Sequence, residues 1–236
     1  MTRTLVLLSG GVDSTALIAH YRERGDSVGT LSINYGQRHR RELAAAARVA
    51  DSYGLPHQTA ELGILGEILT GSALTDPSIP VPEGAYDQDT MRTTVVPNRN
   101  MILMSVAVGA AVARGYDRVA IGAHTGDHHV YADCRPNFLR AFSLAAGLAV
   151  EDCAPPEFTV AAPFMHLPKW QIVLRAADMG APLHHTWSCY VGGAMHCGLC
   201  GTCVERREAF ALAAVPDPAT YAADNQNGQN GNRERV

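Results

Sequence analysis

The turn after the first apolar run of the chain is the feature that most restricts its fold. Residues 4–8 are a run of mainly aliphatic side chains, and residues 9–15 read Ser-Gly-Gly-Val-Asp-Ser-Thr before a helical pattern begins. Glycines let backbone N–H groups approach a bound anion closely, and a helix N-terminus adds the positive end of its dipole. The hydroxyls of Ser9, Ser14 and Thr15 are further donors. The segment therefore predicts a phosphate-binding turn between a buried strand and a helix.

Asp13 decides which kind of phosphate-binding turn this is. The Walker pattern requires a lysine that is absent here, and the dinucleotide-binding pattern G-x-G-x-x-G is absent too. A carboxylate within an anion-binding turn is explained if Mg²⁺ bridges the Asp13 side chain and the oxygens of a pyrophosphate group. The alternative is an ordinary Gly-Gly turn whose polar residues only cap the helix.

Strand-like and helical patterns alternate along the chain. We expect strands at residues 4–8, 28–34, 58–62 and 118–122, and helices at residues 14–24, 38–53, 98–114, 136–150, 168–179 and 202–213. This order implies right-handed crossovers and an α/β fold, a parallel sheet with helices on both faces. Residues 63–95, rich in proline, glycine and acidic side chains, break the alternation and predict a long loop, either a lid or a disordered segment.

Length and charge limit the possible classes of protein. A chain of 236 residues and 25.2 kDa buries about 70% of its extended surface on folding, enough for one full core. We expect one domain over residues 1–222 and a disordered polar tail over residues 223–236. The net charge of −4 argues against a nucleic-acid partner. With no apolar run of about 18 residues and no signal peptide, we expect a cytoplasmic protein without a membrane partner.

Four of the six cysteines lie within fifteen residues and predict a metal site. Cys189, Cys197, Cys200 and Cys203 have the spacing C-x7-C-x2-C-x2-C. Four thiolates suit a closed tetrahedral Zn²⁺ site, which leaves no position for water and is therefore structural. An iron–sulfur cluster and unliganded thiols are the alternatives, although the run C-x3-C-P that continues ferredoxin motifs is missing. The remaining two cysteines are expected to be reduced thiols.

Further motifs, together with the turn and the cysteines, resemble one family over residues 4 to about 221. These motifs are residues 34–39 (Asn-Tyr-Gly-Gln-Arg-His), 96–100 (Val-Pro-Asn-Arg-Asn), 131–136 (Tyr-Ala-Asp-Cys-Arg-Pro) and 186–190 (Thr-Trp-Ser-Cys-Tyr), and Pro163 with Lys169. Their order is similar to that of the 7-cyano-7-deazaguanine synthases, the QueC family of PP-loop ATP pyrophosphatases. The chain departs from the family pattern at Asn98 (usually Gly), at Ala132 (usually Pro) and at His128-His129 (often Ser-Gly).

The resemblance implies a fold and a reaction. The fold would be that of the adenine nucleotide α-hydrolases, a parallel five-stranded sheet followed by a four-cysteine zinc segment. The reaction would convert 7-carboxy-7-deazaguanine, ammonia and ATP to the nitrile, with AMP and pyrophosphate as products. Because removing two carboxylate oxygens takes two adenylations, an amide lies between them. No glutaminase signature is present, so free ammonia is the expected donor, and we expect a homodimer.

We also expect particular residues to bind ATP and act on it. The nucleotide would contact the first turn and its neighbours, which are Leu8, Ser9, Gly10, Gly11, Val12, Asp13, Ser14 and Thr15. Asp13 with Mg²⁺ would bind the triphosphate, and the catalytic cations Arg99 and Lys169 would neutralise charge at the α-phosphate.

The deazaguanine substrate has an acid group and a base edge to be recognised. Arg135 would face the 7-carboxylate, and Asp127 or Asp133 would accept hydrogen bonds from the guanine-like edge. For Asp133, a position at the start of the next helix is the competing interpretation. The run of His124, His128 and His129 is expected to be polar lining of the pocket.

Two other functions stay open from the sequence. One is an enzyme of the same fold that stops at the amide or transfers it to another acceptor. The other is a zinc module that binds nucleic acid without catalysis, which would call for a basic stripe that the net charge does not favour.

Overall fold

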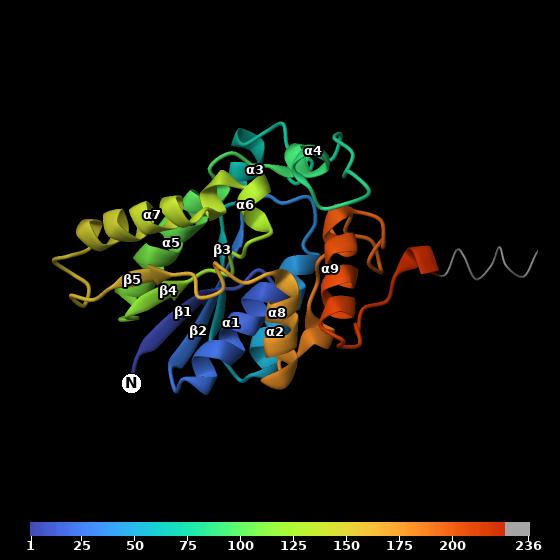
Figure 1. The fold of residues 1–236 in the computed structure, drawn as a ribbon. Helices are drawn as coiled ribbons and strands as arrows, with labels where there is room; N and C mark the ends of the chain where they lie inside the picture. The colour runs from blue at the N-terminus through green and yellow to red at the C-terminus, as the bar shows by residue number, and fades with distance from the viewer. Residues whose placement is uncertain (225–236) are drawn as a thin grey trace, which may run out of the picture.

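The computed structural model describes residues 1–224 as a five-stranded parallel sheet covered by helices on both faces (Figure 1). The strand order is β3-β2-β1-β4-β5 and every neighbouring pair is parallel. The strands are β1 (Arg3–Leu7), β2 (Ser27–Asn34), β3 (His57–Glu61), β4 (Arg118–Ala120) and β5 (Thr159–Ala161). This topology confirms the predicted fold class. The expected tail lies, from residue 225 onward, outside the described residues.

Helices follow the strands in the alternation that the sequence predicts. The long ones are α1 (Val12–Glu23), α2 (Arg41–Ser52), α5 (Arg99–Ala113), α7 (Pro136–Ala149), α8 (Lys169–Asp178) and α9 (Gly201–Leu212). The short ones are α3 (Ile64–Ile68), α4 (Gln88–Met91) and α6 (Asp127–Val130). In residues 1–224 no single helix is long and apolar enough to cross a membrane, although the pair Gln88–Thr94 and Arg99–Ala113, bent by 56°, meets the length and composition criteria together.

Strand β1 divides the core between the two faces of the sheet. Leu5 belongs to a buried cluster with residues of α5 and α7, whereas its neighbour Val6 packs with residues of α1, α2, α8 and α9. Successive strand residues point to opposite faces, so neighbouring apolar residues of β1 contribute to the core on both sides of the sheet. Figure 1 shows α5 and α7 on one side of the sheet and α1, α2, α8 and α9 on the other.

The fifth strand, β5, is one element that the strand patterns in the sequence do not reveal. It is three residues long, pairs with β4 at the edge of the sheet and lies between prolines. A run of three residues is too short to show a strand period. Only its pairing with β4 makes it a strand.

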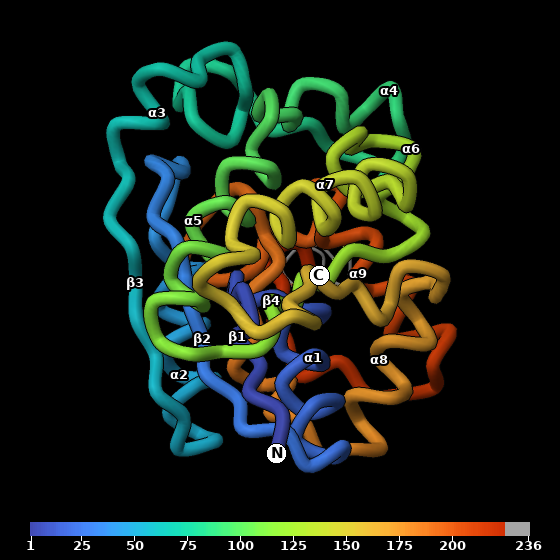
Figure 2. The backbone as a smooth tube through the Cα atoms, turned by 90° about the vertical axis from the view of Figure 1, so that its left-hand side faces the viewer, coloured from blue at the N-terminus to red at the C-terminus, as the bar shows by residue number. Residues whose placement is uncertain are grey.

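The segment predicted as a long loop crosses the carboxyl ends of the strands. It is irregular except for α3, α4 and a short 3₁₀ turn, and in Figure 2 α3 and α4 lie with α6 at the end of the molecule opposite the N-terminus. The Arg38 guanidinium donates to the backbone oxygens of Ala73, Pro77 and Ile79, which ties the segment to the end of β2. A backbone bridge joins Glu83 to Cys200. The segment is therefore packed over the carboxyl ends of the strands, where the phosphate-binding turn lies.

At the carboxyl end of β1, Gly10 brings together the first turn, helix α2 and the segment around Trp187. Its φ of +83° is in the left-handed region, and a Cβ at this position would clash with the backbone oxygen of Glu42 and lie 2.7 Å from the backbone nitrogen of Ala46. Its own oxygen accepts a hydrogen bond of 2.9 Å from the backbone nitrogen of Trp187. Only glycine combines this backbone conformation with this close approach. The first turn therefore packs directly on α2 and on the segment that leads to the cysteines.

Candidate functional site

A cavity lies over the carboxyl ends of β1, β2 and β4, where ligands of open parallel sheets usually bind. Its walls come from residues 7–9 and 11–14, from α2, α5 and the start of α6, and from residues 187, 188 and 190. Of the residues predicted to bind or act on a ligand, those that line it are Leu8, Ser9, Gly11, Val12, Asp13, Ser14, Arg99, Asp127 and Lys169. Gly10, Thr15, Asp133 and Arg135 do not line it.

Hydroxyl groups hold the turn in shape from within. The backbone nitrogen of Ser9 donates to Ser14 Oγ at 3.2 Å, and that of Gly11 donates to Ser9 Oγ at 3.2 Å. Thr15 Oγ1 donates to the Gly11 oxygen at 2.8 Å, and its side chain is fully buried. Thr15 therefore supports the turn from behind, which is a different role from the predicted contact with the nucleotide.

A buried charge cluster stands at the turn. Lys169 Nζ lies 3.0 Å from Asp13 Oδ2 and 3.0 Å from Glu205 Oε2. Burial would lower the pKa of Lys169, but the charges of Asp13 and Glu205 outweigh it and raise the pKa above the ordinary value. Burial raises the pKa of Asp13, but the lowering by Lys169 and His124 is larger. The pKa of Asp13 is therefore below its ordinary value. Lys169 and Asp13 therefore both stay charged near neutral pH.

His124 is buried behind this cluster. Its Nε2 lies 3.6 Å from Asp127 Oδ2 and 3.9 Å from oxygens of both Asp13 and Glu205. The backbone nitrogen of Gly126 donates to His124 Nδ1 at 3.0 Å, so a neutral ring carries its proton on Nε2, toward the carboxylates.

The expectation that three histidines line the pocket is wrong. His124 lies behind the cavity wall, His128 Nε2 contacts Met165 Sδ at 3.0 Å, and His129 is exposed. The different directions of His128 and His129 follow from the short helix α6, which turns the side chains of consecutive residues to different sides.

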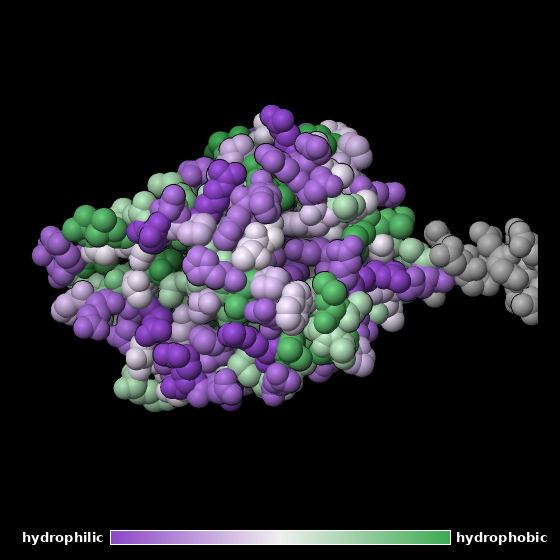
Figure 3. All heavy atoms as spheres, viewed as in Figure 1, coloured by the Kyte–Doolittle hydropathy of each residue, from purple (hydrophilic) through white to green (hydrophobic). Residues whose placement is uncertain are grey.

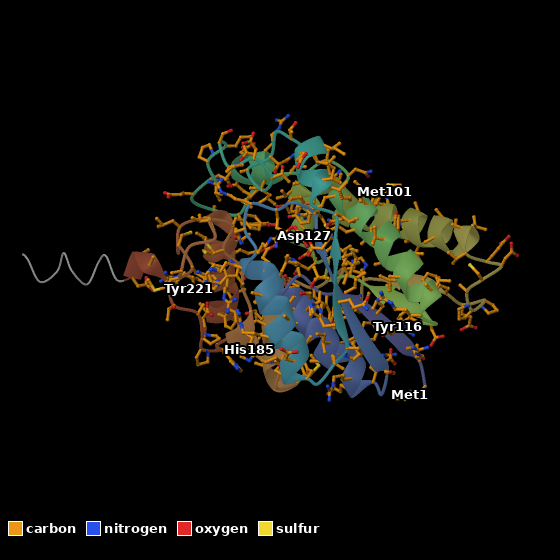
Figure 4. All side chains as sticks on the ribbon, turned by 180° about the vertical axis from the view of Figure 1, so that it is seen from behind. Met1, Met101, Tyr116, Asp127, His185 and Tyr221 are labelled. Atoms are coloured by element: carbon orange, nitrogen blue, oxygen red, sulfur yellow. The ribbon has the colours of Figure 1, made fainter. Side chains whose placement is uncertain are left out.

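Asp127 faces the cavity from the start of α6. Its Oδ2 accepts a hydrogen bond of 3.1 Å from the backbone nitrogen of His124, and its Oδ1 accepts one of 3.3 Å from the hydroxyl of Tyr86. Figure 4 shows Asp127 between the sheet and the short helices that cover its end. Tyr86 belongs to the segment predicted as a loop, so that segment supplies part of the cavity wall.

Arg99 lines the cavity from the first residue of α5. Its guanidinium carbon lies 5.8 Å from the ring centre of Tyr35 and 5.6 Å from that of Tyr131. Tyr190 joins this group, because its hydroxyl is 3.4 Å from that of Tyr131. The preceding residue, Asn98, has a φ of +60°, a conformation that glycine and asparagine adopt with least strain, which explains why asparagine replaces the usual glycine there.

Glu42 lines the cavity from the first turn of α2, and sequence reasoning missed it. Burial raises the pKa of its carboxyl to about 7, against the opposing charge of Arg99. Within residues 1–224 no hydrogen bond links its carboxylate to another group. In the sequence, Glu42 is distinguished only by lying three residues after the motif 34–39. A glutamate in the first turn is common in helices, so this position alone does not indicate a site residue.

Asp133 and Arg135 make contacts of another kind. Asp133 Oδ2 accepts a hydrogen bond of 2.9 Å from the backbone nitrogen of Asn100, and its Oδ1 one of 3.2 Å from Asn100 Nδ2. The side chain thus satisfies an N-terminal backbone group of α5. Arg135 is exposed, and its Nε donates to the backbone oxygen of His128 at 2.9 Å. Both residues support the walls around the cavity from outside it.

The four cysteines come together as the spacing predicts. Their Sγ atoms all lie within 4.8 Å of one another, and those of Cys197 and Cys203 are 3.8 Å apart. A tetrahedral ion with metal–sulfur bonds of about 2.3 Å would place its sulfurs about 3.8 Å apart. The backbone nitrogens of Leu199 and Cys200 donate to Cys197 Sγ. The group could therefore hold a metal ion.

Helix α9 joins the cysteine group to the cavity. Cys200 caps it, Cys203 lies in its first turn, and Glu205 reaches the charge cluster. Arg206, whose side chain is fully buried, binds Asp217 with its Nη2 at 2.9 Å and Thr186 Oγ1 with its Nη1 at 2.8 Å. Residues of one helix thus contribute to the cysteine group, to the cavity wall and to the contact with the C-terminal segment.

Comparison with known proteins gives one consistent family. A family model described as "queuosine biosynthesis protein QueC" matches residues 3–214. Two curated relatives named "7-cyano-7-deazaguanine synthase" are similar over 93% of this chain. The one from Ruegeria pomeroyi is 49% identical and covered over 94% of its length, and the one from Allorhizobium ampelinum is 48% identical and covered over 92%.

Solved structures show weaker likeness. A predicted subunit of a tRNA methyltransferase from Methanocaldococcus jannaschii has a TM-score of 0.48 at 14% identity, covering 75% of both chains. An NH₃-dependent NAD synthetase from Campylobacter jejuni has a TM-score of 0.44 at 17% identity, covering 78% of this chain and 66% of the other.

The ion pair behind α9 predicts a strong effect of one substitution on stability. Burial raises the pKa of Asp217, but hydrogen bonds and charge from Arg206 outweigh it and keep the pKa below the ordinary value. We expect Asp217→Asn to lower the free energy of unfolding by about 3–5 kcal/mol at pH 7, because it leaves Arg206 buried without its partner. Asp224→Asn, which breaks the exposed pair with Arg207, should cost less than about 1 kcal/mol.

Urea unfolding of both variants at several pH values checks this prediction. A group whose pKa is lowered by folding stabilises the protein above its unfolded pKa, and this contribution is lost as the pH falls through the folded value. The deficit of Asp217→Asn should therefore be full above pH ~4 and shrink in more acidic solution. Equal deficits for the two variants would contradict a buried role for Arg206.

Proposed function

The chain belongs to the QueC family of queuosine biosynthesis proteins, and from that premise we propose that its cavity converts 7-carboxy-7-deazaguanine, ammonia and ATP to 7-cyano-7-deazaguanine. One observation carries the proposal: a single cavity joins two unlike ends. At one end the glycine turn meets Asp13 and Lys169. At the other, Arg99 lies among tyrosine rings, which suits a planar aromatic acid.

The chemistry requires both ends. ATP adenylates the carboxylate and releases pyrophosphate, and ammonia then displaces AMP to form the amide. A second ATP adenylates the amide oxygen, and loss of AMP and protons leaves the nitrile. The turn binds the departing pyrophosphate through backbone N–H groups and the N-terminus of α1. The walls of the cavity limit the access of water, which would otherwise hydrolyse the acyl-adenylate.

We assign the recognition of the acid group to Arg99 in place of Arg135. Arg99 lines the cavity and Arg135 is exposed outside it. The 7-carboxylate becomes joined to the α-phosphate on adenylation, so one guanidinium can neutralise charge on both. Asp127 and Glu42, both lining the cavity, are then the acceptors for the N–H groups of the guanine-like edge.

Metal ions have two separate places in this proposal. Four thiolates at tetrahedral spacing favour Zn²⁺, and a shell of four sulfurs makes it a structural ion. At the other site Mg²⁺ arrives with ATP. The Asp13 carboxylate is suited to hold it, because no group within residues 1–224 forms a hydrogen bond with the buried Asp13 Oδ1. Mg²⁺ there would neutralise charge on the phosphate oxygens.

We also propose that residues 1–222 form one domain and that the protein is a homodimer. Figure 3 shows apolar residues at the outer end of α7, where Leu144 and Leu148 are exposed by 68% and 62%. An exposed apolar surface of this kind is typical of a subunit contact. A cytoplasmic location and the absence of a nucleic-acid partner stay predictions.

The reaction itself is the first prediction. Purified protein given 7-carboxy-7-deazaguanine, ATP, Mg²⁺ and ammonium should form the nitrile, with two pyrophosphates released for each nitrile. Mass spectrometry identifies the product, and a sample without ammonium is the control. Accumulation of the amide alone, with one pyrophosphate each, would mean that this chain stops after the first half of the reaction.

The assignment of the acid group predicts different losses for two arginine variants. Arg99→Ala should cost about 2–4 kcal/mol of transition-state stabilisation with the acid as substrate, because a buried charged contact is lost. The loss should be smaller with the amide, which has no carboxylate. Arg135→Ala, at the exposed position, should stay within about twofold of the unmodified chain for both substrates. Steady-state kcat/KM values of both variants with both substrates check this prediction. A larger loss for Arg135→Ala than for Arg99→Ala would assign recognition of the acid group to Arg135 instead.

The cysteine group predicts one Zn²⁺ per chain. Metal analysis of protein purified without air should find stoichiometric zinc and no acid-labile sulfide. Cys200→Ala should lower the zinc content and abolish cooperative unfolding, since the binding energy of a structural zinc is folding energy. Cys153→Ala, at an exposed cysteine outside the group, is the matched control and should change neither.

A further inference from the structure

Lys169 is the only lysine in a chain with 18 arginines, and it lies in the cavity. A lysine differs from an arginine in carrying a compact charge on a flexible four-carbon stem. Such a charge fits one phosphate oxygen well, but its position has to be fixed by neighbours. In this chain the neighbours are two carboxylates, those of Asp13 and Glu205, each 3.0 Å from Nζ.

The two carboxylates do not have the same relation to ATP. Asp13 belongs to the phosphate-binding turn and, under the proposed function, turns to the Mg²⁺ that accompanies the triphosphate. Lys169 would then share that partner with the ion, and Glu205 would stay as its second anchor. Glu205 also carries a negative charge beside a site for a polyanion, so it opposes the binding of ATP. We therefore expect Glu205 to contribute by fixing the position of the Lys169 ammonium group.

The fold holds Glu205 firmly in place. It follows Cys203 by two residues in α9, and the buried Arg206 next to it anchors the helix to Asp217. Across the cavity wall a Cβ at Gly126 would lie 3.0 Å from Glu205 Oε1, so the chain approaches the carboxylate closely there. The side chains of Glu205 and Lys169 are only 14% and 15% exposed. A contact screened from water in this way restricts the ammonium group more than a surface pair does.

We propose that Glu205 is a positioning residue for the adenylation steps, acting by holding the Lys169 ammonium group in place for the α-phosphate. The proposal rests on the proposed function of Lys169 in the reaction. It also gives the cysteine group a link to catalysis, because α9 carries both Cys203 and Glu205.

The variant Glu205→Gln tests this role, with Glu208→Gln as the matched control. Gln keeps the shape of the side chain, and Glu208 is an exposed glutamate of the same helix. We expect Glu205→Gln to lower kcat by about 10- to 100-fold, because the ammonium group loses the charge of one of its two carboxylate neighbours in a contact screened from water. Its KM for ATP should stay the same or fall, because a repelling charge is removed. Glu208→Gln should leave both unchanged.

A second measurement needs no turnover. Protein labelled with ¹⁵N-lysine should give one side-chain ammonium signal in nuclear magnetic resonance spectra, since Lys169 is the only lysine. We expect slow proton exchange and a visible signal in the unmodified chain and in Glu208→Gln, and faster exchange with a weaker signal in Glu205→Gln, where only Asp13 still contacts the ammonium group. If the unmodified chain forms neither nitrile nor amide, the proposed function fails, whereas this signal still reports whether Glu205 holds the ammonium group.

Two further variants separate positioning from other roles. In a Lys169→Ala background, Glu205→Gln should cause no further loss of kcat, because its effect passes through the lysine. Glu205→Asp, which keeps the charge, should recover part of the activity. An additional loss in the Lys169→Ala background, an unchanged kcat or ammonium signal in Glu205→Gln, or a tenfold higher Mg²⁺ requirement would each overturn the proposal.

Discussion

The close contact of Gly10 with the first turn of α2 is the constraint on which the rest of the site depends. It allows the backbone of the turn to approach α2 without a side chain between them, and it sets Glu42 beside the turn. The hydrogen bond from Trp187 to the Gly10 oxygen brings in the segment that continues to Cys189. The phosphate-binding turn, a wall of the cavity and the cysteine group thus have their relative positions fixed at one glycine.

The charges of the cavity are arranged around this turn. Lys169 lies between two carboxylates, whereas Arg99 lies among tyrosine rings. The acidic groups suit an ion that arrives with a triphosphate, and the arginine suits an anionic aromatic acid. An acyl group and an α-phosphate meet where these two ends join. The division of charge therefore matches a reaction that links a carboxylate to a nucleotide, which agrees with the family of the chain.

The cysteine group is connected to the cavity through helix α9. Its ligands begin helix α9, and this helix presents Glu205 to the cavity and Arg206 to the C-terminal segment. A metal ion that orders the first turn of α9 would order both. This arrangement explains how a structural site can matter to chemistry without lying in the cavity.

Residue patterns alone determined the parallel α/β class, the place of the phosphate-binding turn and the four clustered cysteines, because these depend on local spacing. The turn pattern also singled out Asp13, and the resemblance to the family motifs singled out Arg99 and Lys169; the structure brings all three to one cavity. Tertiary structure decided the rest. It made a strand of β5, turned Arg135 outward, and brought Glu42 and Glu205 to the cavity from separate helices. The direction of a polar side chain depends on how its helix packs against distant segments, and local sequence does not contain that information.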